Sequence, residues 1–136
     1  MKIVIDASVA AAWSFEDEES PATERVAELV ETFGAWVPNL FPTEIANVLL
    51  VAERRRRILP SQVDSQIQLL SALGLTIDLD SNLHAWNETF SLARGERLTV
   101  YDATYLELAL RLGAHLATLD VDLAAAARRR GLTVLP

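Results

Sequence analysis

The chain has 136 residues, 51% of them hydrophobic, and a formal net charge of −7 at pH 7, and this length is typical of one domain with a buried core. It contains no cysteine, which excludes disulfides and thiolate metal sites, and its two histidines are too few to suggest a zinc site. No signal-peptide pattern opens the chain and no apolar run is long enough to cross a membrane, so we expect a soluble cytoplasmic protein with a single domain over residues 1–136.

Five short runs of β-prone residues alternate with helical patterns along the chain. The first run starts at residue 2, and each of the other four follows a glycine that ends a helical pattern. Glycine suits that position because it adopts a left-handed backbone conformation at little cost. The expected strands cover residues 2–5, 35–37, 75–77, 115–118 and 132–134. The repeated order of helix, glycine and strand predicts an α/β fold with parallel strands connected by helices.

Apolar residues at helical spacing predict about seven helices around this sheet. They cover approximately residues 9–15, 20–33, 42–57, 60–73, 81–94, 100–112 and 121–130. The spacing predicts that the fifth helix buries Leu83, Trp86, Phe90 and Ala93, and that Phe33 and Ile67 lie on buried faces of earlier helices. We interpret Trp13, Trp36 and Trp86 as core or interface residues rather than as platforms on which bases stack.

Four acidic residues fall where a parallel sheet would bring them together. Asp6 and Asp120 each end an expected strand, and Glu44 and Asp102 lie in the first turns of two expected helices. The carboxyl ends of parallel strands and the amino ends of the following helices share one edge of the sheet, where ligands bind. Crowded carboxylates raise one another's pKa, and a hard divalent cation with oxygen ligands relieves that repulsion. The pattern therefore indicates a Mg²⁺ or Mn²⁺ site.

Each of these acids also has a purely structural explanation. Asp120 has the position of an N-cap for the helix that follows it, and Thr99 and Asp102 have the spacing of a capping box. A negative charge at Glu44 favours the positive end of a helix dipole. Aspartate is one of the residue types common in turns, so Asp6 also fits a turn. Acids at two strand ends are more than capping requires, and this favours the metal site.

Polar residues close to the four acids suggest supporting roles. Asn47 lies three residues after Glu44, on the same helix face, and a hydrogen bond from it would orient that carboxylate. Ser8 and Thr118 place hydroxyls near the strand-end aspartates. A role as a helix cap accounts equally well for Ser8, and a role as an ordinary β-branched strand residue accounts equally well for Thr118. Asp122 is either a peripheral ligand or an acid in a first helical turn. The sequence shows no catalytic serine or cysteine set and no glycine-rich phosphate loop. Among the reaction types considered, metal-assisted hydrolysis therefore remains.

The basic residues are clustered, which matters more for a nucleic-acid partner than the negative net charge does. Arginines fill positions 54–57 and 128–130, where they either contact phosphates or offset helix dipoles. Arg94 and Arg97 lead into the turn that carries Asp102, and we predict that they lie on the path of a nucleic-acid substrate. The acidic run Glu16–Glu19 is interpreted as a solvated loop without an assigned role.

Four segments carry the acids in a fixed order along the chain: IVIDASV at residues 3–9, EIANVL at 44–49, YDATY at 101–105 and LATLD at 116–120. In these segments the sequence resembles the PIN-domain ribonucleases, and specifically the VapC-type toxins of toxin–antitoxin pairs. The resemblance spans essentially the whole chain and implies a three-layer αβα fold with five parallel strands in the order 3-2-1-4-5. It implies a Mg²⁺- or Mn²⁺-dependent endoribonuclease, an antitoxin that blocks its site, and commonly a homodimer. Asp6, Glu44, Asp102 and Asp120 correspond to the family's acidic quartet.

Three other interpretations are weighed against this one. A HAD-type phosphatase also has an aspartate after its first strand but needs a second acid two residues later, where this chain has Ser8. A response-regulator receiver needs a lysine after its last strand, and the only lysine here is Lys2. A catalytically silent PIN module that serves as a binding partner would have no need of four clustered acids.

Overall fold

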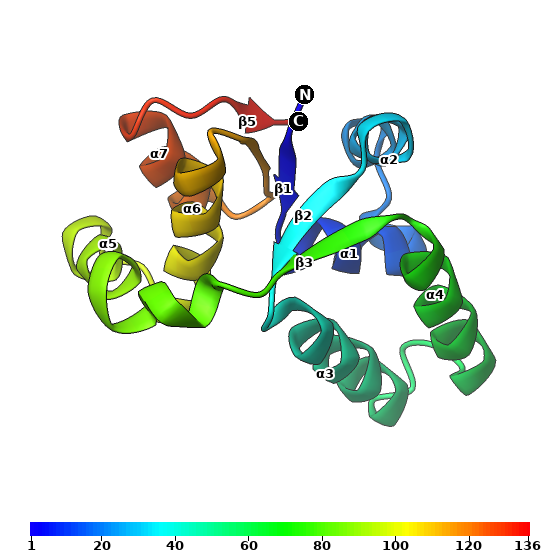
Figure 1. Ribbon diagram of the computed structural model, residues 1–136. Helices are drawn as coiled ribbons and strands as arrows, with labels where there is room; N and C mark the ends of the chain where they lie inside the picture. Colours follow the sequence, from blue (N-terminus) through cyan, green and yellow to red (C-terminus); the bar gives the residue numbers. More distant parts are fainter.

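Five parallel strands form the centre of the computed structural model, which describes residues 1–136 (Figure 1). The strands are β1 (Ile3–Ile5), β2 (Ala35–Pro38), β3 (Leu75–Asp78), β4 (His115–Ala117) and β5 (Val134–Leu135). Their order across the sheet is β3-β2-β1-β4-β5, and Val4 at the centre is in register with Trp36 on one side and Leu116 on the other. This order confirms the predicted topology. It excludes a receiver fold, whose strand order is 2-1-3-4-5.

Seven α-helices, as predicted, cover the two faces of the sheet. They are α1 (Ala7–Ser14), α2 (Pro21–Phe33), α3 (Phe41–Arg54), α4 (Pro60–Ala72), α5 (Phe90–Glu96), α6 (Val100–Leu112) and α7 (Val121–Arg129). Figure 1 shows α1 to α4 on one side of the sheet and α5 to α7 on the other. The reason is that crossovers between parallel strands are right-handed. The chain moves outward from β1 to β3 and then returns across the sheet to β4 and β5, so the helices change face.

The core lies between these layers and is centred on β1. Ile3, Val4 and Ile5 are buried without alternation, as expected for a strand that is covered on both faces. Helix α6 packs against β1, β2 and β4, and its residues 103–109 are all buried. None of the helices combines the length and the apolar character that crossing a membrane requires.

The prediction of one continuous helix over residues 81–94 was wrong. A 3₁₀ turn (Ser81–His84) and a π-helical segment (Ala85–Thr89) precede α5. Both wind the backbone at a pitch different from that of an α-helix, so the predicted apolar face does not stay aligned with the core. Leu83 is 71% exposed and Trp86 is 93% exposed, and of the four residues predicted to be buried only Ala93 is so.

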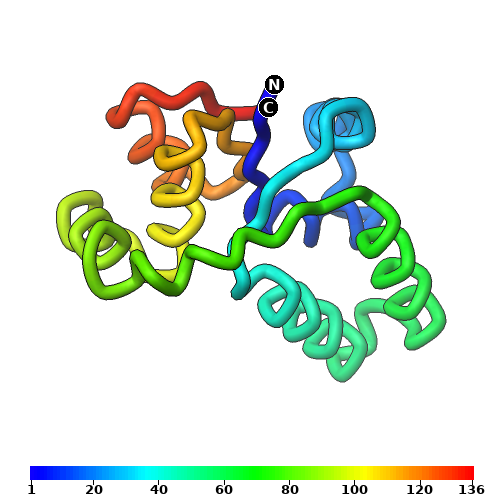
Figure 2. Tube along the Cα trace, viewed as in Figure 1, coloured from blue at the N-terminus to red at the C-terminus, as the bar shows by residue number.

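Phe33 and Ile67 were also predicted to be buried and are exposed instead. Phe33 is the last residue of α2, beyond the stretch in which Val26 and Val30 contact the core. Ile67 lies on α4, which forms a hairpin with α3 that extends away from the sheet (Figure 2). The side chain of Ile67 faces an open space between α3 and α4 rather than a closed core.

Candidate metal centre at the carboxyl edge of the sheet

Asp6 is the most buried of the four predicted acids, with 3% of its surface exposed. It directly follows β1 and is the N-cap of α1, because its Oδ1 accepts a hydrogen bond from the amide of Val9 at 3.2 Å. The Ser8 hydroxyl also donates to Oδ1, and the Thr118 hydroxyl donates to Oδ2. Burial raises the pKa of Asp6, and the bonds from Ser8 and Thr118 partly oppose that rise. The capping role and the position at the ligand-binding edge therefore coexist in one residue.

Ser8 and Thr118 connect the ends of β1 and β4. Besides donating to Asp6, the Ser8 hydroxyl accepts from the amide of Leu119 at 3.0 Å, and the Thr118 hydroxyl accepts from the amide of Asp120 at 3.0 Å. The two hydroxyls thus hold the loop after β4 against Asp6. Asp120 is half-buried and caps α7 through a 2.8 Å bond from the amide of Leu123 to its Oδ1.

Asp122 lies in the first turn of α7 and is exposed. Its charge contributes to raising the pKa of Asp102, but less than the charges of Asp120 and Asp6 do. Asp122 therefore lies at the periphery of the acidic group.

Glu44 lies in the first turn of α3, and a hydrogen bond from α6 fixes one of its oxygens. Its Oε1 accepts from the hydroxyl of Tyr105 at 2.7 Å. Burial raises the pKa of Glu44, the Tyr105 bond lowers it, and the charges of Asp102 and Asp6 raise it further. Asn47, the partner that we predicted for Glu44, is exposed and forms no hydrogen bond with it. The sequence contained one signal for Tyr105, which lies three residues after Asp102 on the same helix.

Asp102 completes the acidic edge from the first turn of α6. Thr99 caps this helix, since its hydroxyl accepts from the amide of Asp102 at 3.1 Å. Burial raises the pKa of Asp102, and the negative charges of Asp120 and Asp6 raise it further. The charges of Asp6, Asp102 and Asp120 thus raise the pKa of Glu44 or of Asp102, and the four acids come to this edge from four different elements of the chain.

The chemistry of this edge fits a hard divalent cation. Asp6, Glu44 and Asp102 all have raised pKa values, and no basic side chain is among the groups that perturb them. As the side chains lie, no three of them converge closely enough to enclose an ion. The donor set consists of carboxylate oxygens, which suit Mg²⁺ and Mn²⁺, and its negative charge is unbalanced.

The predicted substrate arginines are exposed and belong to no ion pair. The guanidinium of Arg94 lies over the ring of Phe90, 4.6 Å from its centroid. Arg97 ends α5 with a left-handed backbone, at a φ of 56°.

The arginine clusters, in contrast, are partly occupied by structural contacts. Arg57 pairs with Asp17 at 3.0 Å and with Glu18 at 2.7 Å, and it also lies over the ring of Phe15. The acidic run Glu16–Glu19 is therefore not simply a solvated loop, because it includes a 3₁₀ turn attached to the end of α3. Arg129 and Arg130 both pair with Glu96.

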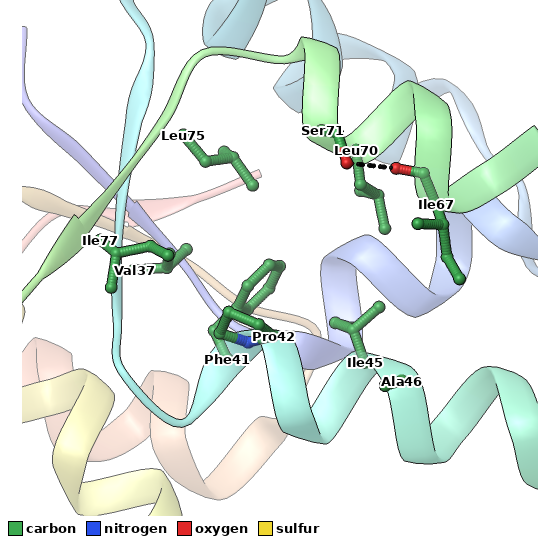
Figure 3. A pocket seen from close by; sticks show the side chains of 10 residues that line it. All are labelled: Val37, Phe41, Pro42, Ile45, Ala46, Ile67, Leu70, Ser71, Leu75 and Ile77. Atoms are coloured by element: carbon green, nitrogen blue, oxygen red, sulfur yellow. Dashed lines mark hydrogen bonds between the residues drawn. The ribbon is translucent and has the colours of Figure 1, made fainter.

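An apolar groove of about 390 Å³ lies between α3, α4 and the β2–β3 edge of the sheet (Figure 3). Phe41, Pro42 and Ile45 line it from α3, the helix that carries Glu44. From the opposite wall, Ile67 and Leu70 of α4 face the same space. The first turns of α3 therefore connect the acidic edge to the groove.

Comparison with known proteins identifies relatives along nearly the whole chain. A family model described as "PIN domain" matches residues 3–129. A protein described as Ribonuclease VapC3, from Pyrobaculum aerophilum, is 32% identical over 124 residues, which cover 91% of this chain and 93% of that protein.

Two solved structures share the fold. The crystal structure of PAE2754 from Pyrobaculum aerophilum matches with a TM-score of 0.71 at 21% identity, over 98% of this chain and 83% of that one. The crystal structure of Mycobacterium tuberculosis VapC20, a toxin that cleaves the sarcin-ricin loop, matches with a TM-score of 0.64 at 17% identity, over 91% of this chain and 94% of that one.

Proposed function

The chain belongs to the PIN-domain family and is homologous to VapC ribonucleases, and from this premise we propose that it is a metal-dependent endoribonuclease and the toxin of a toxin–antitoxin pair. The observation that carries the proposal is the gathering of four carboxylates from four elements at one sheet edge, where no basic side chain is among the groups that shift the pKa of Asp6, Glu44 or Asp102. A catalytically silent module would gain nothing from that unbalanced charge, which destabilises the folded chain.

Asp6, Glu44, Asp102 and Asp120 would hold Mg²⁺ or Mn²⁺ through their carboxylate oxygens. When bound, the cation would lower the pKa of a water molecule and balance charge on the phosphoryl oxygens. In the hydrolysis, the water molecule gives up a proton as its oxygen forms a bond to phosphorus, the bond from phosphorus to one ribose oxygen breaks, and that ribose oxygen takes up a proton.

The chain's own contribution is to keep these carboxylates charged and oriented. Ser8 and Thr118 occupy both oxygens of Asp6 with donated hydrogen bonds, which favour its ionised form despite burial. In Asp120, the cap bond engages Oδ1. We propose that Asp122 adds negative charge at the edge without binding the ion directly, and that Asn47 is left free on the exposed face of α3.

Arg94 and Arg97 are the residues that we propose for contact with the RNA backbone. Both are exposed and free of carboxylate partners, in contrast to Arg57, Arg129 and Arg130. A few free arginines suffice for a local phosphate path, because the distribution of charge matters more than its sum.

We further propose that a cognate antitoxin neutralises the enzyme and uses the groove beside α3 for an apolar helix. The groove is lined mainly by hydrophobic side chains, which suits the apolar face of an amphipathic helix. Since α3 carries Glu44, a partner seated there would lie next to the acidic edge. We also propose a homodimer whose interface includes the exposed apolar side chains of Leu79, Leu83 and Trp86.

Cleavage of an end-labelled single-stranded RNA by the purified chain tests the proposed activity. We expect cleavage with Mg²⁺ or Mn²⁺ and none with excess EDTA. Asp6→Asn and Asp102→Asn should both be inactive, whereas Asp64→Asn, which changes an exposed acid on α4, should cleave normally. Full activity in both site variants would refute the proposal.

A further inference from the structure

We propose that Tyr105 is a positioning residue that fixes the Glu44 carboxylate for metal binding, an inference that rests on the proposed function. Its hydroxyl donates to Glu44 Oε1 at 2.7 Å, and these residues lie 61 positions apart. Tyr105 is 1% exposed, so it reaches Glu44 from inside the core.

The bond assigns different tasks to the two oxygens of Glu44. A phenol that donates to a carboxylate forms a short, charge-assisted hydrogen bond, and here it engages Oε1. Oε2 is left for a metal ion, so Glu44 would bind through a single oxygen. A glutamate side chain has several freely rotating bonds, and ordering it only when the metal arrives would weaken binding.

The same bond ties two metal-binding helices together. Asp102 and Tyr105 lie one turn apart on α6, so the backbone that positions Asp102 also positions the donor to Glu44 on α3. A displacement of α3 relative to α6 would therefore disturb both Glu44 and its spacing from Asp102.

The hydroxyl is not needed to fill the core. A phenylalanine ring would occupy the same buried space, and the hydroxyl is tolerated there because it has a hydrogen-bond partner. That partner is a carboxylate of the acidic edge rather than a backbone carbonyl of the core. This distinguishes a positioning role from a packing role.

The first test compares Mn²⁺ affinity, measured by calorimetry, in wild type, Tyr105→Phe and Tyr101→Phe. Tyr101 is the chain's other tyrosine and is exposed, so the control removes a hydroxyl from the same helix without touching Glu44. We expect Tyr105→Phe to weaken Mn²⁺ binding by roughly 10- to 100-fold, and Tyr101→Phe to leave it unchanged. An unchanged affinity in folded Tyr105→Phe would overturn the inference.

A double-mutant cycle tests whether Tyr105 acts through Glu44. In a Glu44→Ala background, adding Tyr105→Phe should change Mn²⁺ affinity by less than about twofold, because the group through which it acts is gone. An equal loss in both backgrounds would mean that Tyr105 affects the site by packing alone, and the proposed positioning role would be wrong.

A third measurement does not require the Tyr105→Phe variant to fold. Tyr101→Phe leaves Tyr105 as the only tyrosine, so 3-fluorotyrosine labelling gives one ¹⁹F signal from this ring. We expect Mg²⁺ to shift that signal with the same Kd that calorimetry with Mg²⁺ gives for this variant. A signal that stays still while calorimetry records binding overturns the inference alone, whereas a wild-type protein that binds neither ion overturns the proposed function as well.

Discussion

The hydroxyl of Thr118 donates a hydrogen bond to Asp6 Oδ2 across 112 positions of the sequence. This bond joins the ends of two adjacent parallel strands at the edge where the four acids lie. Because Asp6 is buried, its charge depends on such donors. The relationship makes Thr118 a support for the Asp6 carboxylate rather than an ordinary strand residue.

Replacing Thr118 with valine should impair both the site and the fold. Valine keeps the shape of threonine but removes the donor to Asp6 and the acceptor for the amide of Asp120. We expect a loss of about 1–3 kcal/mol in the free energy of unfolding and a fall of roughly 10-fold or more in RNA cleavage. Urea unfolding and cleavage rates check this. Thr76→Val, on the exposed side of β3, is the control, and equal effects of the two changes would contradict the prediction.

Removing one negative charge from the acidic edge should stabilise the metal-free protein. Burial and the charges of Asp120 and Asp6 raise the pKa of Asp102, so its charged form is less favourable in the folded state than in the unfolded state. Asp102→Asn should therefore unfold at a higher temperature than wild type in EDTA, while it loses cleavage activity and the stabilisation by added Mn²⁺. Thermal unfolding with and without Mn²⁺ measures this. A lower melting temperature in EDTA would show that the charges at this edge do not strain the fold.

The ion pair between Asp78 and Arg111 should make stability depend on pH. Arg111 donates to both Asp78 oxygens, at 3.2 and 2.7 Å, and its hydrogen bonds hold the pKa of Asp78 below its ordinary value. The stabilisation is therefore complete above about pH 4, the unfolded value, and is lost as pH falls toward the lower folded pKa.

Asp78→Asn tests this pH dependence against wild type. We expect the variant to lose about 2 kcal/mol at pH 7, and the difference between the two proteins to shrink below pH 4. Urea unfolding at several pH values gives the comparison, and Asp80→Asn, at an exposed neighbour, is the control. A difference that stays constant down to pH 2 would refute the assigned role of the ion pair.

Arg94 and Arg97 should contribute to the salt dependence of RNA binding. In an inactive Asp6→Asn background, each phosphate contact that is lost should flatten the slope of log K against log salt by about 0.7 for single-stranded RNA. Arg97→Asn suits its left-handed backbone, because asparagine adopts that conformation more easily than most residues.

Arg54→Ala is the matched control for Arg94→Ala and Arg97→Asn. Arg54 is an exposed arginine at the end of α3, so Arg54→Ala removes the same charge at a position away from the proposed path. Fluorescence anisotropy over a salt series measures the slopes. Parallel slopes in all variants would remove Arg94 and Arg97 from the substrate path.

Trp86 should act in association between chains rather than in folding. Since its side chain is 93% exposed, Trp86→Ser should change the free energy of unfolding by less than about 0.5 kcal/mol. We expect the variant to shift the mass measured by light scattering from dimer toward monomer. Leu69→Ser, at another exposed apolar position, should leave the mass unchanged. A dimer that persists in Trp86→Ser, or a monomeric wild type, would contradict the proposed interface.

The sequence determined the fold class and the positions of the four acids, because both depend on local rules. Glycines at helix ends and short β-prone runs mark alternating elements, and a parallel sheet brings the residues that follow its strands to one edge. Asp6 and Asp120 could therefore be placed from their positions after β1 and β4. The capping role of Asp120 was equally readable, whereas Asp6 was expected to be a turn residue before a cap at Ser8 and is itself the N-cap of α1.

Contacts between distant elements were decided only by the tertiary structure. Spacing along α3 pointed to Asn47 as the partner of Glu44, but the approach of α6 supplies Tyr105 instead. The sequence suggested no role for the acidic run at 16–19, whereas in the structure its Asp17 and Glu18 pair with Arg57. Likewise, the 3₁₀ and π turns before α5 rotate Leu83 and Trp86 into solvent, against their helical spacing. Periodicity records which face of an element is apolar, whereas the partner of each side chain depends on how separate elements pack, which no local pattern contains.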